Sequence, residues 1–167
     1  MHDELTPGDI QKIKDEIEHR TRVLRPQLLA EVKRTREYGD LSENYEYKAA
    51  KQEKNRNESR IRYLQQMIDT AIVVNKSGDT DTVDLFDRIT VWIPEDEEEA
   101  VFRIVTTVRV NALEGIISKE SPIGRALMGH RVGDTVLVSV NDRFSYEMEI
   151  RAIEKGEDDG DIPINRY

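Results

Sequence analysis

The stretch Gly39-Asp40-Leu41-Ser42-Glu43-Asn44 separates two long segments with helical periodicity. Before it, apolar residues recur at helical spacing, and they are Ile10, Ile13, Ile17, Leu24, Leu28 and Val32. After it, a seam keeps heptad spacing through Tyr47, Ala50, Lys54, Asn57, Ile61, Leu64, Ile68 and Ala71. Gly39 can adopt the positive φ that ends a helix. Because the connection is short, the helices must run antiparallel. The sequence therefore predicts a coiled-coil hairpin over residues 1–75, with this stretch at its tip.

The first helical segment has a start signal and an interruption. Thr6 suits the N-cap position and Pro7 the first helical position, where its missing N–H costs nothing. Pro26 lies inside the same segment, and proline removes a backbone donor and clashes with the preceding turn. We therefore expect a kink or a short break near Arg25.

The second half of the chain changes to a period of two. Residues 76–83 are polar and form a predicted linker. Strands are predicted at 88–93, 100–105, 115–118, 135–140 and 145–153, and Ser121, Pro122 and Gly129 mark the N-cap, first position and C-cap of a short helix. Residues 84–154 should thus form an antiparallel sheet with one helix. The predicted fold class is α+β, and we expect the acidic tail 155–167 to be loosely ordered.

Composition excludes several classes of protein. The chain of 167 residues has no cysteine, so it has neither disulfides nor thiolate metal sites. No apolar run approaches the ~18 residues of a membrane span, and the acidic N-terminus does not resemble a signal peptide. The net charge of −9 argues against simple wrapping of nucleic acid, but residues 1–76 are nearly neutral and 77–167 carry the acidic excess. We expect two modules in a cytoplasmic, monomeric protein.

The tip carries two carboxylates three positions apart, Asp40 and Glu43, which allow two interpretations. In the first they form a capping box, in which Asp40 is the N-cap of the second helix and Glu43 reaches back to it. In the second they are ligands of Mg²⁺, which favours carboxylate oxygens and often takes only one or two from a protein. Two carboxylates cannot complete such a site, so a metal site in another protein would have to supply the remaining ligands.

Basic and aromatic residues flank the tip. Arg36 and Lys51 lie close to it on facing arms and could hold a phosphate backbone near the carboxylates. Tyr45 and Tyr47 could stack on a base, although Tyr47 lies on the heptad seam and is equally suited to packing. The same cations could also be ordinary solvated charges of a helix surface.

The run Glu37–Ala50 resembles the tip of the bacterial Gre transcript-cleavage factors, the GreA type in particular. Other segments match in order and spacing, namely Arg25-Pro26, Phe102–Val105 and Ser121–Gly129. The resemblance covers about Thr6 to Glu154. It implies an N-terminal coiled coil that enters the secondary channel of RNA polymerase and an FKBP-like C-terminal domain that docks at the rim of that channel.

The resemblance also implies roles for individual residues. Asp40 and Glu43 would help the polymerase hold its second catalytic Mg²⁺, so that backtracked RNA is cut near its extruded 3′ end. Asn44 and Tyr47 would support the tip, and Arg36 and Lys51 would face the RNA. Polymerase docking would involve the segment Ser121, Pro122 and Ile123. The chain would then be a cofactor protein of polymerase and no nuclease itself.

Two other functions fit part of the sequence. Some members of the family occupy the channel but inhibit polymerase, so a plug without cleavage stimulation is the main alternative. A prolyl isomerase using the FKBP-like domain is the second. Its pocket would need aromatic walls, and residues 77–167 offer few aromatic side chains beyond those that a core requires.

Overall fold

The computed structural model describes residues 3–37, 44–158 and 160–165 of the chain. The chain divides into two compact units. One is helical and contains Ile10–Ile72. The other contains a sheet and comprises Val73–Tyr167 together with the N-terminal segment Glu4–Asp9. We describe each unit by itself.

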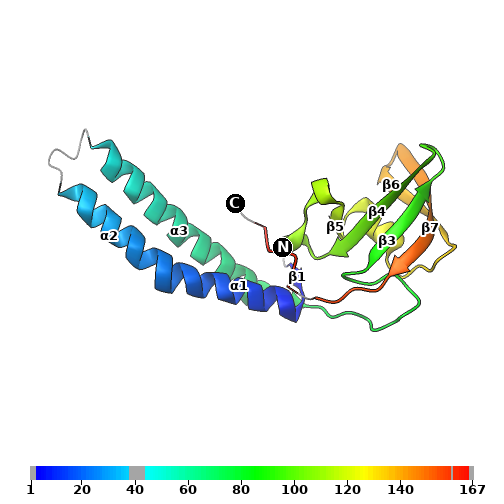
Figure 1. Ribbon diagram of the computed structural model, residues 1–167, viewed down its shortest axis with the longest axis horizontal. Coiled ribbons are helices and arrows are strands. Elements are labelled where there is room, and N and C mark those ends of the chain that lie inside the picture. Colours follow the sequence, from blue (N-terminus) through cyan, green and yellow to red (C-terminus); the bar gives the residue numbers. More distant parts are fainter. Residues whose placement is uncertain (1–2, 38–43, 159, 166–167) are drawn as a thin grey trace. The chain divides into compact units, whose positions relative to one another are not determined.

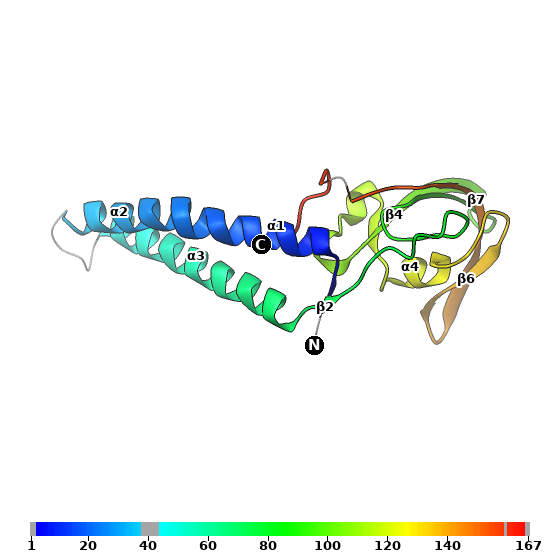
Figure 2. The same ribbon diagram turned by 90° about the horizontal axis from the view of Figure 1, so that it is seen from below.

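The helical unit is a hairpin. Helix α1 (Pro7–His19) continues through a π-helical segment (Arg20–Leu24) into α2 (Arg25–Arg36), and α3 (Tyr45–Thr70) runs back beside them (Figures 1 and 2). Three of the predicted seam residues are buried, namely Ala50, Asn57 and Leu64, and Ile13 is buried on the first arm. The predicted hairpin is confirmed. In the described residues, no helix is long and apolar enough to cross a membrane.

The expected irregularity lies one turn earlier than Arg25. Pro26 falls in the first turn of α2, and the five residues before α2 form the π-helical segment. In this segment the N–H of Arg25 bonds to the carbonyl of Arg20, five residues back. A proline without an N–H cannot continue the ordinary ladder, and the looser π turn accommodates it without ending the helix.

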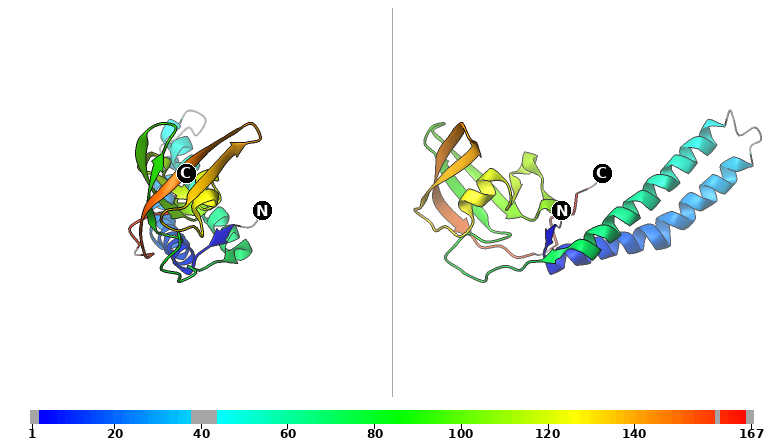
Figure 3. Two further views of the ribbon diagram at one scale, coloured as in Figure 1. Left: turned by 90° about the vertical axis from the view of Figure 1, so that its right-hand side faces the viewer. Right: turned by 180° about the vertical axis from the view of Figure 1, so that it is seen from behind.

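The sheet unit holds five strands in the order β5-β4-β3-β7-β6. Their bounds are β3 Arg88–Ile93, β4 Glu98–Val105, β5 Ile116–Ser118, β6 Thr135–Asn141 and β7 Phe144–Glu154. The strands curl around the short helix α4 (Pro122–Leu127), which contacts β6 (Figure 3). The fully buried side chains of the core include Ile89, Val91, Ile104, Met148 and Ile150. The predicted α+β class is confirmed.

Two features of the strands differ from the prediction. The sheet is not wholly antiparallel, because β5 pairs with β4 in the parallel direction. Two 3₁₀ turns, Thr107–Arg109 and Ala112–Glu114, carry the chain back between these strands and make the parallel pairing possible. A small second sheet joins β1 (Glu4–Leu5) to β2 (Ile72–Val73), and neither of these two-residue strands was predicted.

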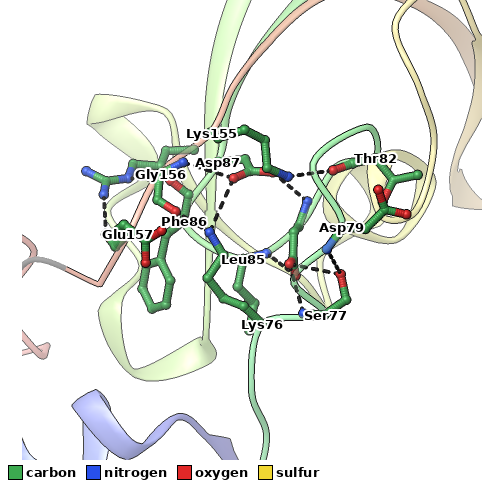
Figure 4. A network of polar contacts seen from close by, with 12 residues as sticks. Lys76, Ser77, Asp79, Thr82, Leu85, Phe86, Asp87, Lys155, Gly156 and Glu157 are labelled. Carbon is green, nitrogen blue, oxygen red and sulfur yellow. Dashed lines mark hydrogen bonds and ion pairs between the residues drawn. The ribbon is translucent and has the colours of Figure 1, made fainter.

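The described part of the tail, residues 155–158 and 160–165, docks on the sheet unit, although we expected it to be loosely ordered. Lys155 donates to the fully buried Asp87 carboxylate, and the N–H of Gly156 bonds to the same carboxylate at 3.0 Å (Figure 4). Lys76 bonds to the carbonyl of Gly156. Farther along, Ile162 inserts into the core. These contacts explain why an acidic segment stays on an acidic module.

A buried charge cluster joins the tail to the N-terminal segment within the sheet unit. The guanidinium of Arg109 is 1% exposed and lies between Asp9, at 2.5 Å, and Asp158, at 2.6 and 2.9 Å. Asp9 also closes the predicted cap of α1, because its carboxylate accepts from the Thr6 N–H and its own N–H donates to the Thr6 hydroxyl. A Cβ on Gly8 would lie 1.8 Å from the Asp158 carboxylate, so a larger residue there would displace this side chain from Arg109.

Candidate functional site

The base of the hairpin tip is fastened by the side chain of Asn44. Its Oδ1 accepts from the N–H of Tyr47 at 3.0 Å, which makes Asn44 the N-cap of α3. Its Nδ2 donates to the carbonyl of Thr35 on α2 at 2.6 Å. One amide thus satisfies a free donor at the start of one helix and a free acceptor near the end of the other. Asn44 therefore joins the start of α3 to the last turn of α2, and its role in supporting the tip stays a prediction.

The N-cap bears directly on the two interpretations of the tip carboxylates. A capping box built on Asp40 would start the helix four residues earlier and place Glu43 at its third position. In the structure α3 begins at Tyr45, and Asn44 fills the capping position. The capping box that we considered is therefore wrong, and Asp40 and Glu43 are not needed to cap this helix. Both residues lie outside the described part of the chain.

The flanks of the tip carry exposed cations, as the sequence suggested. Arg36 ends α2, and its guanidinium lies 5.9 Å from the centre of the Tyr47 ring, a cation–π contact across the two arms. Lys51 is exposed in the second turn of α3. One turn before the end of α2, a hydrogen bond from Arg34 holds the pKa of Glu31 below its usual value. The cations thus lie on both arms.

Thr35 is the residue that the sequence analysis missed. It is fully buried near the tip, and its hydroxyl donates to the carbonyls of Glu31 and Val32, at 2.9 and 3.1 Å. These bonds hold the last turn of α2 and leave the Thr35 carbonyl facing the Asn44 amide. A threonine at the end of a charged helix gives no sequence signal for this role, because the partner is nine residues away.

Replacing Asn44 by alanine should destabilise the helical unit by about 0.5–2 kcal/mol, the usual loss for an N-cap. The change also leaves the Thr35 carbonyl without its partner across the tip. Urea unfolding followed by far-ultraviolet circular dichroism measures this loss. The matched control is Asn55→Ala, which removes the same side chain from an exposed position of the same helix. Equal stability of the two variants would show that the hydrogen bonds of Asn44 to Tyr47 and Thr35 do not stabilise the helical unit.

The segment expected to dock on polymerase begins helix α4. The Ser121 hydroxyl accepts from the Gly124 N–H at 3.0 Å and donates to the Ser118 carbonyl at 2.6 Å, so the predicted N-cap is confirmed. Pro122 is exposed at the first position, whereas Ile123 is half-buried against the core. A Cβ on Gly124 would lie 2.1 Å from the Ser118 carbonyl, so the turn requires glycine. The segment is a rigid corner that presents Pro122 to solvent.

Comparisons with known proteins agree across both units. Residues 4–73 match the family described as "Transcription elongation factor, N-terminal", and residues 78–155 match "Transcription elongation factor, GreA/GreB, C-term". The chain is 36% identical over 151 residues to transcription elongation factor GreA of Staphylococcus carnosus, covering 90% of this chain and 94% of the relative. It is 39% identical over 146 residues to GreA of Brucella canis, covering 86% and 93%.

A solved structure is also similar. The GreA factor homolog 1 of Thermus thermophilus is 26% identical, with 93% of this chain and all of that chain covered and a TM-score of 0.42. The two family matches together span nearly the whole chain, and the relatives align over almost their full length. The chain therefore belongs to the GreA/GreB family of transcription elongation factors.

Proposed function

We propose that this chain binds bacterial RNA polymerase and stimulates it to cut nascent RNA whose 3′ end has been extruded by backtracking. The observation that carries the proposal is the N-cap of α3. Because Asn44 caps the helix, capping does not account for the two carboxylates beside it, Asp40 and Glu43. Hard oxygen donors at the end of a helical hairpin are suited to completing a magnesium site that another protein provides in part.

The chemistry would belong to the polymerase, and this chain would supply ligands. When bound, Mg²⁺ activates a water molecule and stabilises the charge on the leaving oxygen of the phosphodiester. Asp40 and Glu43 would hold the second, weakly bound ion. Asn44 would position them, because it fixes the residue that follows Glu43 to both arms of the hairpin.

The cations beside the tip would act on the RNA. Arg36 and Lys51 are exposed on opposite arms, so both can approach a phosphate backbone that passes the tip. The contact between Arg36 and the Tyr47 ring limits the directions in which the guanidinium can point. Neither residue needs to touch the reacting atoms. Both would hold the RNA while the carboxylates hold the ion.

The sheet unit would carry the docking surface, through Ser121, Pro122 and Ile123. The cap and the close glycine packing fix the shape of this corner, so docking there requires little rearrangement. We further propose that the factor acts as a cytoplasmic monomer, one per polymerase.

The test is a stalled, backtracked elongation complex with radiolabelled RNA, incubated with and without the protein. Shortening of the RNA, followed by renewed elongation from the new 3′ end, supports the proposal. Unshortened RNA together with slower elongation would identify a channel plug and contradict it. Unshortened RNA without any effect on elongation would contradict the polymerase partnership itself.

A further inference from the structure

The helical unit contains a polar cluster in the middle of its seam. Asn57 of α3 is 3% exposed, at a position where the heptad pattern calls for an apolar residue. Its Nδ2 donates to the carbonyl of Arg20 at 3.1 Å, and its Oδ1 accepts from the Arg20 guanidinium at 3.0 Å. Both hydrogen bonds join the same two residues across the arms. If Asn57 were not opposite Arg20, its amide would lose both hydrogen bonds, and leaving a buried amide without partners costs free energy.

The partner of Asn57 occurs where the first arm departs from ordinary helix. Arg20 begins the π-helical segment. Its carbonyl accepts from the N–H of Arg25, five positions on, where a regular α-helix would use the N–H four positions on. From Ile13 to Thr35, both fully buried, the first arm advances 22 residues, one more than three heptads. A π segment absorbs one extra residue in this way. The Asn57 amide therefore meets a carbonyl whose geometry differs from that of the regular turns on either side.

Two further charged contacts surround this pair. The Glu16 carboxylate accepts from Arg20 and from Arg60, both at 3.0 Å, and so links α1 to α3. Arg25 forms a two-pronged bond with Glu58, at 2.7 and 2.9 Å. If the arms slid by one heptad, the contacts between them would be lost, namely those of Asn57 with Arg20, Glu16 with Arg60 and Arg25 with Glu58. Asn57 would then face a turn of regular helix in place of the π segment. Buried polar groups at seam positions are the best-attested devices for fixing the register of paired helices.

We propose that Asn57 is a positioning residue, which fixes the register of the two arms through Arg20 and thereby sets where the tip stands. The inference rests on the proposed function, because the exact position of the tip along the hairpin matters only if the tip must enter a site in another protein. A slide of one heptad moves one arm along the other by about 10 Å. Such a displacement exceeds what metal-ligand geometry tolerates, so even a fraction of misregistered molecules would lower the rate of cleavage.

The first experiment measures register in the free protein. Because the chain has no cysteine, cysteines introduced at the exposed positions Leu29 and Gln52 can carry spin labels without background. Wild type should give one narrow distance distribution. Asn57→Leu should add a second population, displaced by up to about 10 Å. The matched control is Asn55→Leu, the same change at an exposed position two residues away, which should keep the single distribution.

The second experiment measures cleavage of backtracked RNA with the unlabelled variants. For Asn57→Leu, the rate at saturating factor should fall at least about fivefold, while the concentration giving half the maximal effect stays within about twofold, because docking uses the other unit. Asn57→Ala, which adds no volume to the seam, should behave in the same way. A merely structural residue would instead lower the melting temperature and leave the distance distribution single.

A single, unshifted distribution in Asn57→Leu would overturn the proposal, as would a second population with unchanged cleavage. If wild type itself fails to shorten RNA, the proposed function fails, and the label distances still decide whether Asn57 sets the register.

Discussion

Replacing Asp40 by asparagine or Glu43 by glutamine should lower the stimulated rate of RNA cleavage by at least about 10- to 100-fold. That range is the usual loss when a group that merely supports a metal ligand is changed, and a direct ligand should cost no less. Each substitution keeps the shape of the side chain and removes the charge that attracts the cation. Because Asn44 caps α3, neither change should lower the stability of the hairpin.

The matched control for the tip is Glu46→Gln. Glu46 lies in the first turn of α3 and is exposed, so it carries the same charge near the same place. Its substitution should leave cleavage within about twofold of wild type. A binding competition against labelled wild-type factor should show equal affinity of all three variants for polymerase. If Glu43→Gln cleaves as well as wild type, Glu43 is not a metal ligand.

Replacing Arg109 by methionine should destabilise the sheet unit by about 3–5 kcal/mol, the loss expected when one partner of a buried ion pair is removed. The remaining carboxylates, Asp9 and Asp158, would face each other without a cation, and Asp9 is fully buried. The guanidinium also lies 5.3 Å from the centre of the buried Phe86 ring, so packing is lost with the charge. Urea unfolding followed by Trp92 fluorescence measures the change.

Arg125→Met is the matched control for Arg109, because it makes the same substitution at a side chain that is 72% exposed. It should change the free energy of unfolding by no more than about 0.5 kcal/mol. Asp158→Asn tests how much the contact between Arg109 and the tail contributes. This variant should lose less stability than Arg109→Met and more than Arg125→Met. A loss below about 1 kcal/mol for Arg109→Met would mean that this cluster does not hold the tail and the N-terminal segment in place.

The features that could be predicted from the sequence depend on neighbours along the chain. The heptad seam indicated the hairpin, and Ser121 and Pro122 indicated the start of α4, because caps and helical faces involve residues three or four positions apart. Pro26 indicated the irregularity on the first arm, but its form, a π segment beginning at Arg20, could not be predicted from the proline alone.

The features that could not be predicted depend on residues distant in sequence. Nothing in the sequence around Arg109 distinguishes it from an ordinary surface charge. Its partners Asp9 and Asp158 lie near the two ends of the chain and reach it only in the folded protein. The tail is acidic, which suggested a loose segment, yet its docking depends on Lys76 and the buried Asp87. At the tip, the capping box considered from the sequence had Asp40 as the N-cap of the second helix, whereas the structure assigns that position to Asn44.

The most direct test of the account is the magnesium dependence of cleavage in a backtracked complex. With saturating wild-type factor, the Mg²⁺ concentration that gives half the maximal rate should be lower than with Glu43→Gln, and excess Mg²⁺ should partly restore the variant. If wild type and Glu43→Gln require the same Mg²⁺ concentration, the tip does not help to bind the ion, and the central claim is contradicted.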